Sequence, residues 1–165
     1  MRDLKTLAND TPKDYLLHFP QDPVRLALQM EMKAQRLFPI PTGQIGQVVE
    51  TNYSFLYIGP GSGLVVQALL DRGHRAFGLE TSRRGIASAS EMVRNSLVWA
   101  MPWELPFASG RLQGQPIEGQ HTAPTPFKMF QVGILNKYYK EILTKDEWNE
   151  SIKEIKKVCR YAAIV

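Results

Sequence analysis

Short apolar runs alternate with segments of helical periodicity over most of the chain. Runs typical of buried strands cover residues 55–58, 76–79, 97–100 and 130–135, and a fifth begins at Tyr161. Between these runs, apolar residues recur at the spacing of an amphipathic helix. Strands that alternate with helices predict right-handed crossovers and a mostly parallel sheet. We therefore expect one α/β domain.

The predicted helices begin and end at capping signals. Asp22-Pro23 places a proline in the first turn of one helix, and Gly73 lies just past the end of another, where a left-handed cap is expected. Thr144 and Glu147 form a capping box. Together with the apolar spacing, these signals predict helices over residues 23–38, 64–72, 83–95 and 145–159.

Three segments lack such periodicity. Residues 1–23 are polar and interrupted by prolines, and residues 39–53 carry proline, glycine and glutamine, so we expect a loose lead-in and a connector. Residues 108–129 form an irregular insertion that we expect to be flexible. We accordingly divide the chain into an N-terminal helical extension with its connector, residues 1–50, and a main domain, residues 51–165.

Composition limits the kinds of partner. The chain has 165 residues, is 44% hydrophobic and carries a net charge of +4, which permits an anionic partner. No basic stripe with interleaved aromatic residues is present, so nucleic-acid binding is not indicated. Cys159 is the only cysteine, which excludes an intrachain disulfide and a cysteine zinc cluster. We expect it to be a buried thiol on the apolar face of the last helix, and we expect no metal site.

The chain carries no evident targeting or membrane segment. Its first residues lack the apolar run of a signal peptide. No run approaches the roughly 20 apolar residues of a membrane span. We expect an intracellular, cytoplasmic protein.

A glycine-rich turn carries the chemistry. Gly59-Pro60-Gly61-Ser62-Gly63 joins the first strand of the main domain to the helix that starts at Leu64. Glycine adopts positive φ at little steric cost and lets a ligand approach the backbone, and the helix points its first amides at that ligand. Glu80 ends the next strand, where a carboxylate can accept hydrogen bonds from ribose hydroxyls. The pattern predicts a nucleotide-type cofactor site.

The motifs around this turn resemble those of the class I S-adenosylmethionine-dependent methyltransferases. Residues 56–63 look like the first motif of that family, residues 77–80 like the second, and residues 105–107 like the L-P-F stretch after the third strand. The resemblance covers roughly residues 50–165. It implies a Rossmann-like open sheet, mostly parallel, with strand order about 3-2-1-4-5, helices on both faces and an N-terminal helical extension.

The resemblance also implies S-adenosylmethionine as cofactor and assigns its contacts. The implied cofactor-binding residues are Gly59, Gly61, Gly63, Glu80, Met101 and Pro102. The glycines would line the methionine end, the glutamate would hold the ribose, and Met101 with Pro102 would lie against the adenine. The reaction would be direct displacement at the sulfonium methyl, which needs an aligned nucleophile more than a catalytic dyad.

The methyl acceptor is expected at the end of the fourth strand. By position in the resemblance, residues 136–139 would face the acceptor, with Asn136 orienting it and Tyr138 stacking on it. Ordinary amphipathic packing is the alternative interpretation of the two tyrosines in this segment, Tyr138 and Tyr139. No acceptor motif follows Asn136, so small molecule, protein, lipid and RNA all stay open.

The chain departs from the family pattern at several positions. Tyr57, Met101 and Gln131 stand where the family often has an acid. The family usually adds two strands after the fifth, so we expect an apolar edge here that a partner or a missing segment covers. Two alternatives to a methyltransferase therefore stay open.

The first alternative is a degenerate, non-enzymatic module that acts through cofactor or protein contacts. The lost acids favour it. The second is an NAD-dependent oxidoreductase. The dinucleotide fingerprint G-x-G-x-x-G has its third glycine where this chain has Leu64, which argues against that alternative.

Overall fold

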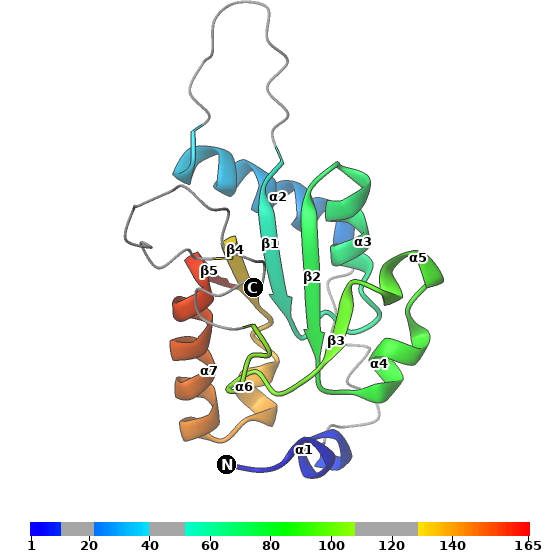
Figure 1. Cartoon of the computed structure of the whole chain (residues 1–165), viewed down its shortest axis with the longest axis vertical. Helices are drawn as coiled ribbons and strands as arrows, with labels where there is room; N and C mark the ends of the chain where they lie inside the picture. Colours follow the sequence, from blue (N-terminus) through cyan, green and yellow to red (C-terminus); the bar gives the residue numbers. More distant parts are fainter. Residues whose placement is uncertain (11–21, 40–51, 108–128) are drawn as a thin grey trace, which may run out of the picture.

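Five parallel strands form one open sheet in the order β3-β2-β1-β4-β5. They are seen in a computed structural model that describes residues 1–10, 22–39, 52–107 and 129–165 (Figure 1). The strands are β1 (Ser54–Ile58), β2 (Arg75–Glu80), β3 (Leu97–Trp99), β4 (Phe130–Leu135) and β5 (Cys159–Ile164). The predicted parallel sheet, its strand order and its Rossmann-like α/β class are confirmed.

The register aligns the carboxyl ends of the three central strands. Ile58, near the end of β1, pairs with Leu79 of β2 on one side and with Leu135 of β4 on the other. The residues that follow these strands therefore meet at one edge of the sheet. In doubly wound folds this carboxyl edge, at the point where strand order reverses, is where ligands bind.

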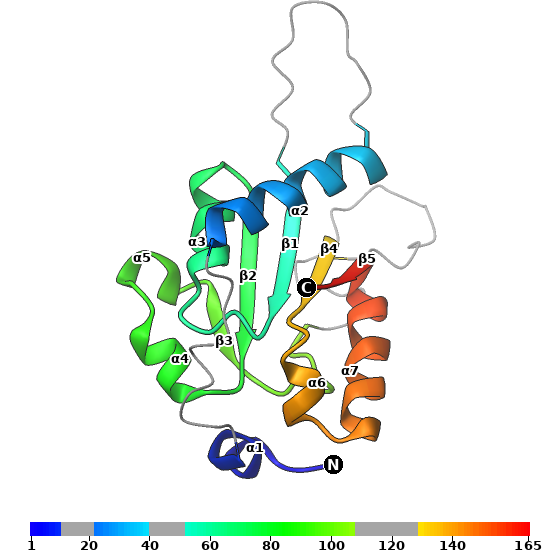
Figure 2. The same cartoon turned by 180° about the vertical axis from the view of Figure 1, so that it is seen from behind.

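Seven helices lie in the described residues, with members on both faces of the sheet (Figures 1 and 2). They are α1 (Leu4–Asp10), α2 (Pro23–Leu37), α3 (Leu64–Asp71), α4 (Arg83–Ser88), α5 (Glu91–Arg94), α6 (Tyr139–Ile142) and α7 (Lys145–Val158). Figure 2 shows α2 crossing in front of the sheet near the start of β1. In both views α1 lies beyond the carboxyl ends of the strands.

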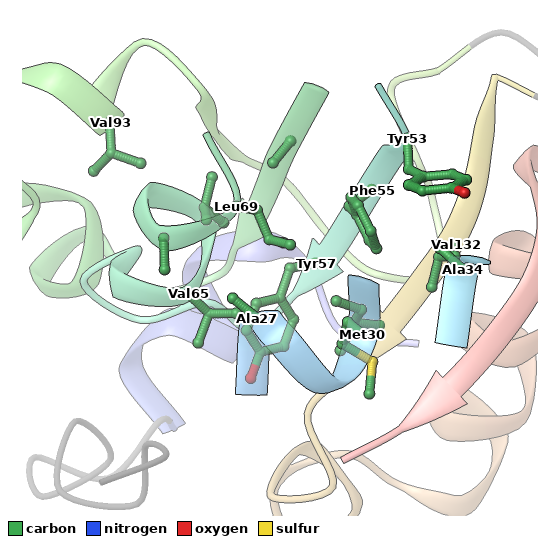
Figure 3. Packing of buried hydrophobic residues seen from close by; sticks show 14 of the residues in the cluster. Ala27, Met30, Ala34, Tyr53, Phe55, Tyr57, Val65, Leu69, Val93 and Val132 are labelled. Atoms are coloured by element: carbon green, nitrogen blue, oxygen red, sulfur yellow. The ribbon is translucent and has the colours of Figure 1, made fainter. Parts of the chain in front are cut away.

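Two clusters of buried side chains hold the helices to the two faces. The first joins α2 and α3 to the sheet through Ala27, Val65 and Tyr57, among others (Figure 3). The second joins α1, α6 and α7 to the opposite face and includes Leu7, which has no exposed surface, and Ile155. Burial of apolar surface on both faces is what a parallel sheet requires.

The expected loose lead-in over residues 1–23 is wrong for its first part, because residues 4–10 form α1. The Asp3 carboxylate accepts a hydrogen bond from the Thr6 amide and so caps this helix. Arg2 binds Glu147 of α7 through its backbone amide at 2.9 Å and through its guanidinium at 2.6 Å. The segment is thus held by contacts with residues far along the chain.

Two further element boundaries need correction. The helix predicted up to Asn95 is interrupted at Ala89, whose extended conformation (ψ 144°) ends α4 before Ser90 begins α5. Serines near the break compete for backbone hydrogen bonds, as Ser88 does by donating to the Gly85 carbonyl. Cys159 is not on the last helix but is the first residue of β5, and it is buried as expected.

Several predictions lie outside the described residues or stay untested. The expected connector and the expected insertion fall mostly on residues 40–51 and 108–128, which are not described. The division at residue 50 stays a prediction. β5 lies at one edge of the described sheet, with Ile164 57% exposed, and the cover expected for that edge stays a prediction.

Candidate cofactor site

The glycine-rich turn has the conformation that its sequence predicts. Gly59, Gly61 and Gly63 have φ values of +75°, +58° and +79°, and within the described residues no non-glycine residue has positive φ. The Gly59 amide donates to the Leu79 carbonyl at 2.9 Å, which fixes the start of the turn beside the end of β2. Gly63 is the N-cap of α3 and has no side chain to shield the first amides of that helix.

Glu80 folds back from the end of β2 onto this turn. Its side chain has no exposed surface. One carboxylate oxygen accepts a hydrogen bond from the Gly61 amide at 2.7 Å, and the other accepts one from the Ser82 amide at 2.8 Å. Hydrogen bonds to backbone amides stabilise a buried carboxylate in its charged form. The predicted ribose-binding acid therefore lies against the predicted glycine turn.

Tyr139, the first residue of α6, completes the same cluster. Its hydroxyl lies 3.3 Å from Oε1 of Glu80 and 2.9 Å from Oγ1 of Thr81. Its ring packs so closely on the turn that a Cβ atom added at Gly59 would lie 2.3 Å from Cε2 of the ring. Tyr139 was expected only to face the acceptor with the rest of residues 136–139, or to pack, and its contact with Glu80 was not predicted.

Asn136 links the turn to the loop after β4. Its side chain is buried, donates from Nδ2 to the Gly59 carbonyl at 3.2 Å and accepts at Oδ1 from the Tyr138 amide at 3.0 Å. Asn136 and Tyr138 also line a hollow of about 530 Å³. The remaining lining residues are Lys137, Lys140, Glu141, Trp148 and Ile164.

The structure thus brings together most of the predicted site residues. Gly61 is hydrogen-bonded to Glu80, and Gly59 to Asn136, which in turn accepts from the Tyr138 amide. Gly63 closes the same turn by donating to the Pro60 carbonyl. Met101 and Pro102 follow β3 at the same edge, but no hydrogen bond to the turn is seen for them among the described residues. Met101 packs against the apolar cluster on the α7 side, and Trp103 is a buried member of that cluster.

Tyr57 occupies the position where the resemblance places an acid. Its hydroxyl is buried and has no hydrogen-bond partner in the described part of the chain. Figure 3 shows the ring between α2 and α3, next to Ala27 and Val65. Burial, and secondarily the charge of Glu80, raise the pKa of this phenol well above its usual value. Tyr57 is therefore a neutral group and does not replace the missing carboxylate.

Metal and membrane signals are both absent from the described ranges. Residues 1–10, 22–39, 52–107 and 129–165 hold no group of three or more His, Cys, Asp or Glu side chains able to bind a metal ion. Across the same ranges, none of the helices has the length and apolar character needed to cross a bilayer.

Comparison with solved structures identifies the architecture. The CcbJ methyltransferase from Streptomyces caelestis matches 96% of this chain with a TM-score of 0.56 at 16% identity, over 55% of its own length. The glycopeptide N-methyltransferase MtfA, in complex with sinefungin, matches 86% with a TM-score of 0.54 at 14% identity, over 47% of its length. A candidate S-adenosyl-L-methionine-dependent methyltransferase of Methanococcus maripaludis, mmp1179, matches 98% with a TM-score of 0.54 at 12% identity, over 61% of its length.

No protein-family model and no curated protein matches the sequence. The chain spans about half to three fifths of the length of these three proteins. At these identities the likeness concerns the fold. The strand order, the glycine turn with Glu80 beside it, and these structural neighbours agree: the chain has the class I S-adenosylmethionine-dependent methyltransferase fold.

Proposed function

We propose that this chain binds S-adenosylmethionine at the glycine turn and acts in methyl transfer. The observation that carries the proposal is the hydrogen bond from the Gly61 amide to the Glu80 carboxylate. It joins the two motifs that the family uses for its cofactor, at the carboxyl edge of a sheet in the family's strand order. One of the structural neighbours, MtfA, was solved with sinefungin bound.

The residues present fit such a cofactor. Three positive-φ glycines bring the backbone close to a ligand, and the uncapped start of α3 offers amide donors. Glu80 is a buried acceptor for ribose hydroxyls. When bound, S-adenosylmethionine supplies a methyl group activated by its sulfonium centre. The chain's own contribution is to bind, to orient and to keep water away.

The hollow lined by Asn136 and Tyr138, named the acceptor-side hollow, suits the acceptor. Asn136 lines this hollow and also donates to the Gly59 carbonyl, so an acceptor bound there would lie next to the glycine turn. Tyr138 and Trp148 give the hollow aromatic walls. We propose that Asn136 orients the acceptor indirectly, by holding the loop that carries Tyr138, since its own amide is already engaged with backbone groups.

One observation favours the non-enzymatic module as a second candidate. Both oxygens of Glu80 accept hydrogen bonds from this chain's own groups, and the glycines of the turn are buried by their neighbours. The Glu80 carboxylate is therefore satisfied without a ligand. A chain that keeps this network as a structural support would retain the fold and act through contacts with other proteins.

Isothermal titration calorimetry distinguishes these functions. We expect the chain to bind S-adenosylmethionine and not NAD. Substituting Glu80→Gln should weaken that binding about tenfold, because one of the two acceptor oxygens becomes an amide nitrogen that cannot accept from the ribose. Glu104→Gln, at an exposed position in the loop after β3, serves as the control and should leave binding unchanged.

Thermal unfolding of each variant would establish that it is folded. A folded wild-type chain that binds neither ligand would transfer support to the non-enzymatic module. Preferential binding of NAD would instead support an oxidoreductase. A Glu104→Gln variant that lost as much affinity as Glu80→Gln would contradict the assignment of Glu80.

A further inference from the structure

A second hollow, of about 440 Å³, lies on the sheet edge formed by β3. It is lined by Arg83, Ile86 and Ala87 of α4, Arg94 of α5 and Trp99 of β3. None of these residues belongs to the glycine turn or to the acceptor-side hollow. Figure 1 shows α4, α5 and β3 side by side, at the opposite edge of the sheet from α7 and β5.

Three side chains that line this hollow, those of Trp99, Arg83 and Arg94, make ordered contacts. The indole nitrogen of Trp99 donates to the Thr81 carbonyl at 2.9 Å. The guanidinium of Arg83 stacks on the indole, 4.1 Å from the ring centroid. Arg94 donates from Nη2 to the Ala89 carbonyl at 3.0 Å. Side chains ordered before a ligand arrives lose less conformational entropy when it binds.

The charge of the hollow is wholly positive. It contains two arginines and no acid, and α4 itself carries no acidic residue. Among the described residues, no carboxylate forms an ion pair with Arg83 or Arg94. Each guanidinium has five N–H donors. Within the described ranges, the hydrogen bond from Arg94 to the Ala89 carbonyl is the one contact that uses any of these donors. Unused guanidinium donors match the paired oxygens of a carboxylate or phosphate.

The remaining lining is apolar. Ile86 and Ala87 add apolar surface, and the Trp99 ring lies beside them with the Arg83 guanidinium over one face. We propose that this hollow is a binding site for a small organic anion, a carboxylate or phosphate carried on a flat apolar ring. The arginines bind the anionic group, and the ring lies on the apolar floor. The hollow shares no lining residue with the glycine turn or with Glu80, although its Trp99 pairs with Glu80 across the neighbouring strands.

The test uses indole-3-acetate as probe and the ¹⁵N-labelled chain as reporter. We expect saturable shifts of the Trp99 indole N–H resonance, with a Kd of about 1 mM for a ligand of this size. Indole-3-acetamide, which has the same ring without the charge, should bind at least about tenfold more weakly, since charge-assisted hydrogen bonds are lost. Acetate alone should cause no saturable shift. Phenyl phosphate in a parallel titration shows which anionic group is preferred.

Two variants and one control locate the site. Arg83→Gln and Arg94→Gln should each weaken indole-3-acetate binding about tenfold. Arg84→Gln, next to Arg83 on the same short helix but not lining the hollow, should leave the affinity unchanged.

Four results would overturn the proposal. They are no saturable shift with either indole-3-acetate or phenyl phosphate, equal binding of the acetamide, equal loss of affinity in Arg84→Gln, and competition of the probe with S-adenosylmethionine. The last result would make the hollow part of the cofactor site. If the chain binds indole-3-acetate but does not bind S-adenosylmethionine, only the proposed function is contradicted. The anion site is tested separately, because the two titrations use different ligands and different residues.

Discussion

The phenolic oxygen of Tyr139 lies 3.3 Å from the carboxylate of Glu80, and neither side chain has any exposed surface. The tyrosine therefore engages the group that we propose holds the ribose of the cofactor. Because the carboxylate is fully buried, a ribose can reach it only after a neighbouring side chain moves. Among the described residues, Tyr139 contacts the carboxylate and also lies over Gly59, so we expect Tyr139 to be the side chain that moves.

Tyr139→Phe should therefore increase affinity for S-adenosylmethionine. The substitution removes a competing hydrogen bond worth about 1 kcal/mol, so we expect Kd to fall by about threefold to tenfold. Calorimetry measures the change. Tyr161→Phe, on β5 and away from the turn, is the control and should have no effect. A loss of affinity in Tyr139→Phe would show that the hydroxyl supports cofactor binding.

Gly59→Ala should destabilise the fold by about 3 kcal/mol. A left-handed backbone costs about 1–2 kcal/mol for alanine, and overpacking against the Tyr139 ring adds about 1–3 kcal/mol. Gly73→Ala provides the matched comparison, because its φ is also positive, +81°, but the nearest atom to its added Cβ is 3.8 Å away. Urea unfolding should show a loss of only about 1–2 kcal/mol there. Equal losses at the two positions would contradict the close approach of Tyr139.

Glu147 should make the stability of the fold depend on acid pH. Burial alone raises the pKa of this carboxyl, but hydrogen bonds from Arg2 and from the Thr144 amide outweigh burial and lower the pKa from 4.5 to about 2. Because the folded pKa is the lower one, the stabilisation is complete above about pH 4.5 and is lost as pH falls toward 2. We expect about 2 kcal/mol, since Arg2 is partly exposed and solvent screens the pair.

Urea unfolding at pH 6 and at pH 2.5 measures this contribution. Glu147→Gln should lower the stability at pH 6 and make much less difference at pH 2.5. Glu150→Gln, which removes a partly exposed partner of Lys153 on the same helix, should change little at either pH. A Glu147→Gln effect of equal size at both pH values would show that the ion pair with Arg2 is not its cause.

Tyr57→Phe should stabilise the protein. The Tyr57 hydroxyl is buried without a hydrogen-bond partner among the described residues, so removing it relieves an uncompensated desolvation cost of about 1 kcal/mol or more. Thermal and urea unfolding would both report the gain. If stability falls instead, the hydroxyl has a partner in solution, such as an ordered water.

The sheet was predictable because independent sequence signals, from apolar spacing to turns and caps, all indicate the same alternation of strands and helices. Buried runs, the glycine turn and the Thr144 capping box each specify the same alternation, so strand order followed from the resemblance and from handedness rules. The capping box is confirmed in both of its hydrogen bonds. Glu80 and Gly61 were predicted to share a site, and their hydrogen bond places them together.

The features that were missed depend on contacts between distant residues. α1 is seven residues long, too short to be stable alone, and is held by Leu7 in the core and by Arg2 on Glu147, 145 positions away. Cys159 begins a strand immediately after α7, where the apolar spacing fits a helix and a strand equally well. Tyr139 acquires its position only when β4 pairs with β1, which no local pattern reveals.

The two hydrogen bonds of Asn136 have a thermodynamic consequence. One amide group holds the Gly59 carbonyl and the Tyr138 amide at once, so a shift of the glycine turn displaces the wall of the acceptor-side hollow. Two ligands that bind on either side of such a shared group influence each other's affinity by the same factor. Donor and acceptor would then bind cooperatively rather than independently, and replacing Asn136 would weaken that coupling before it abolished the binding of either.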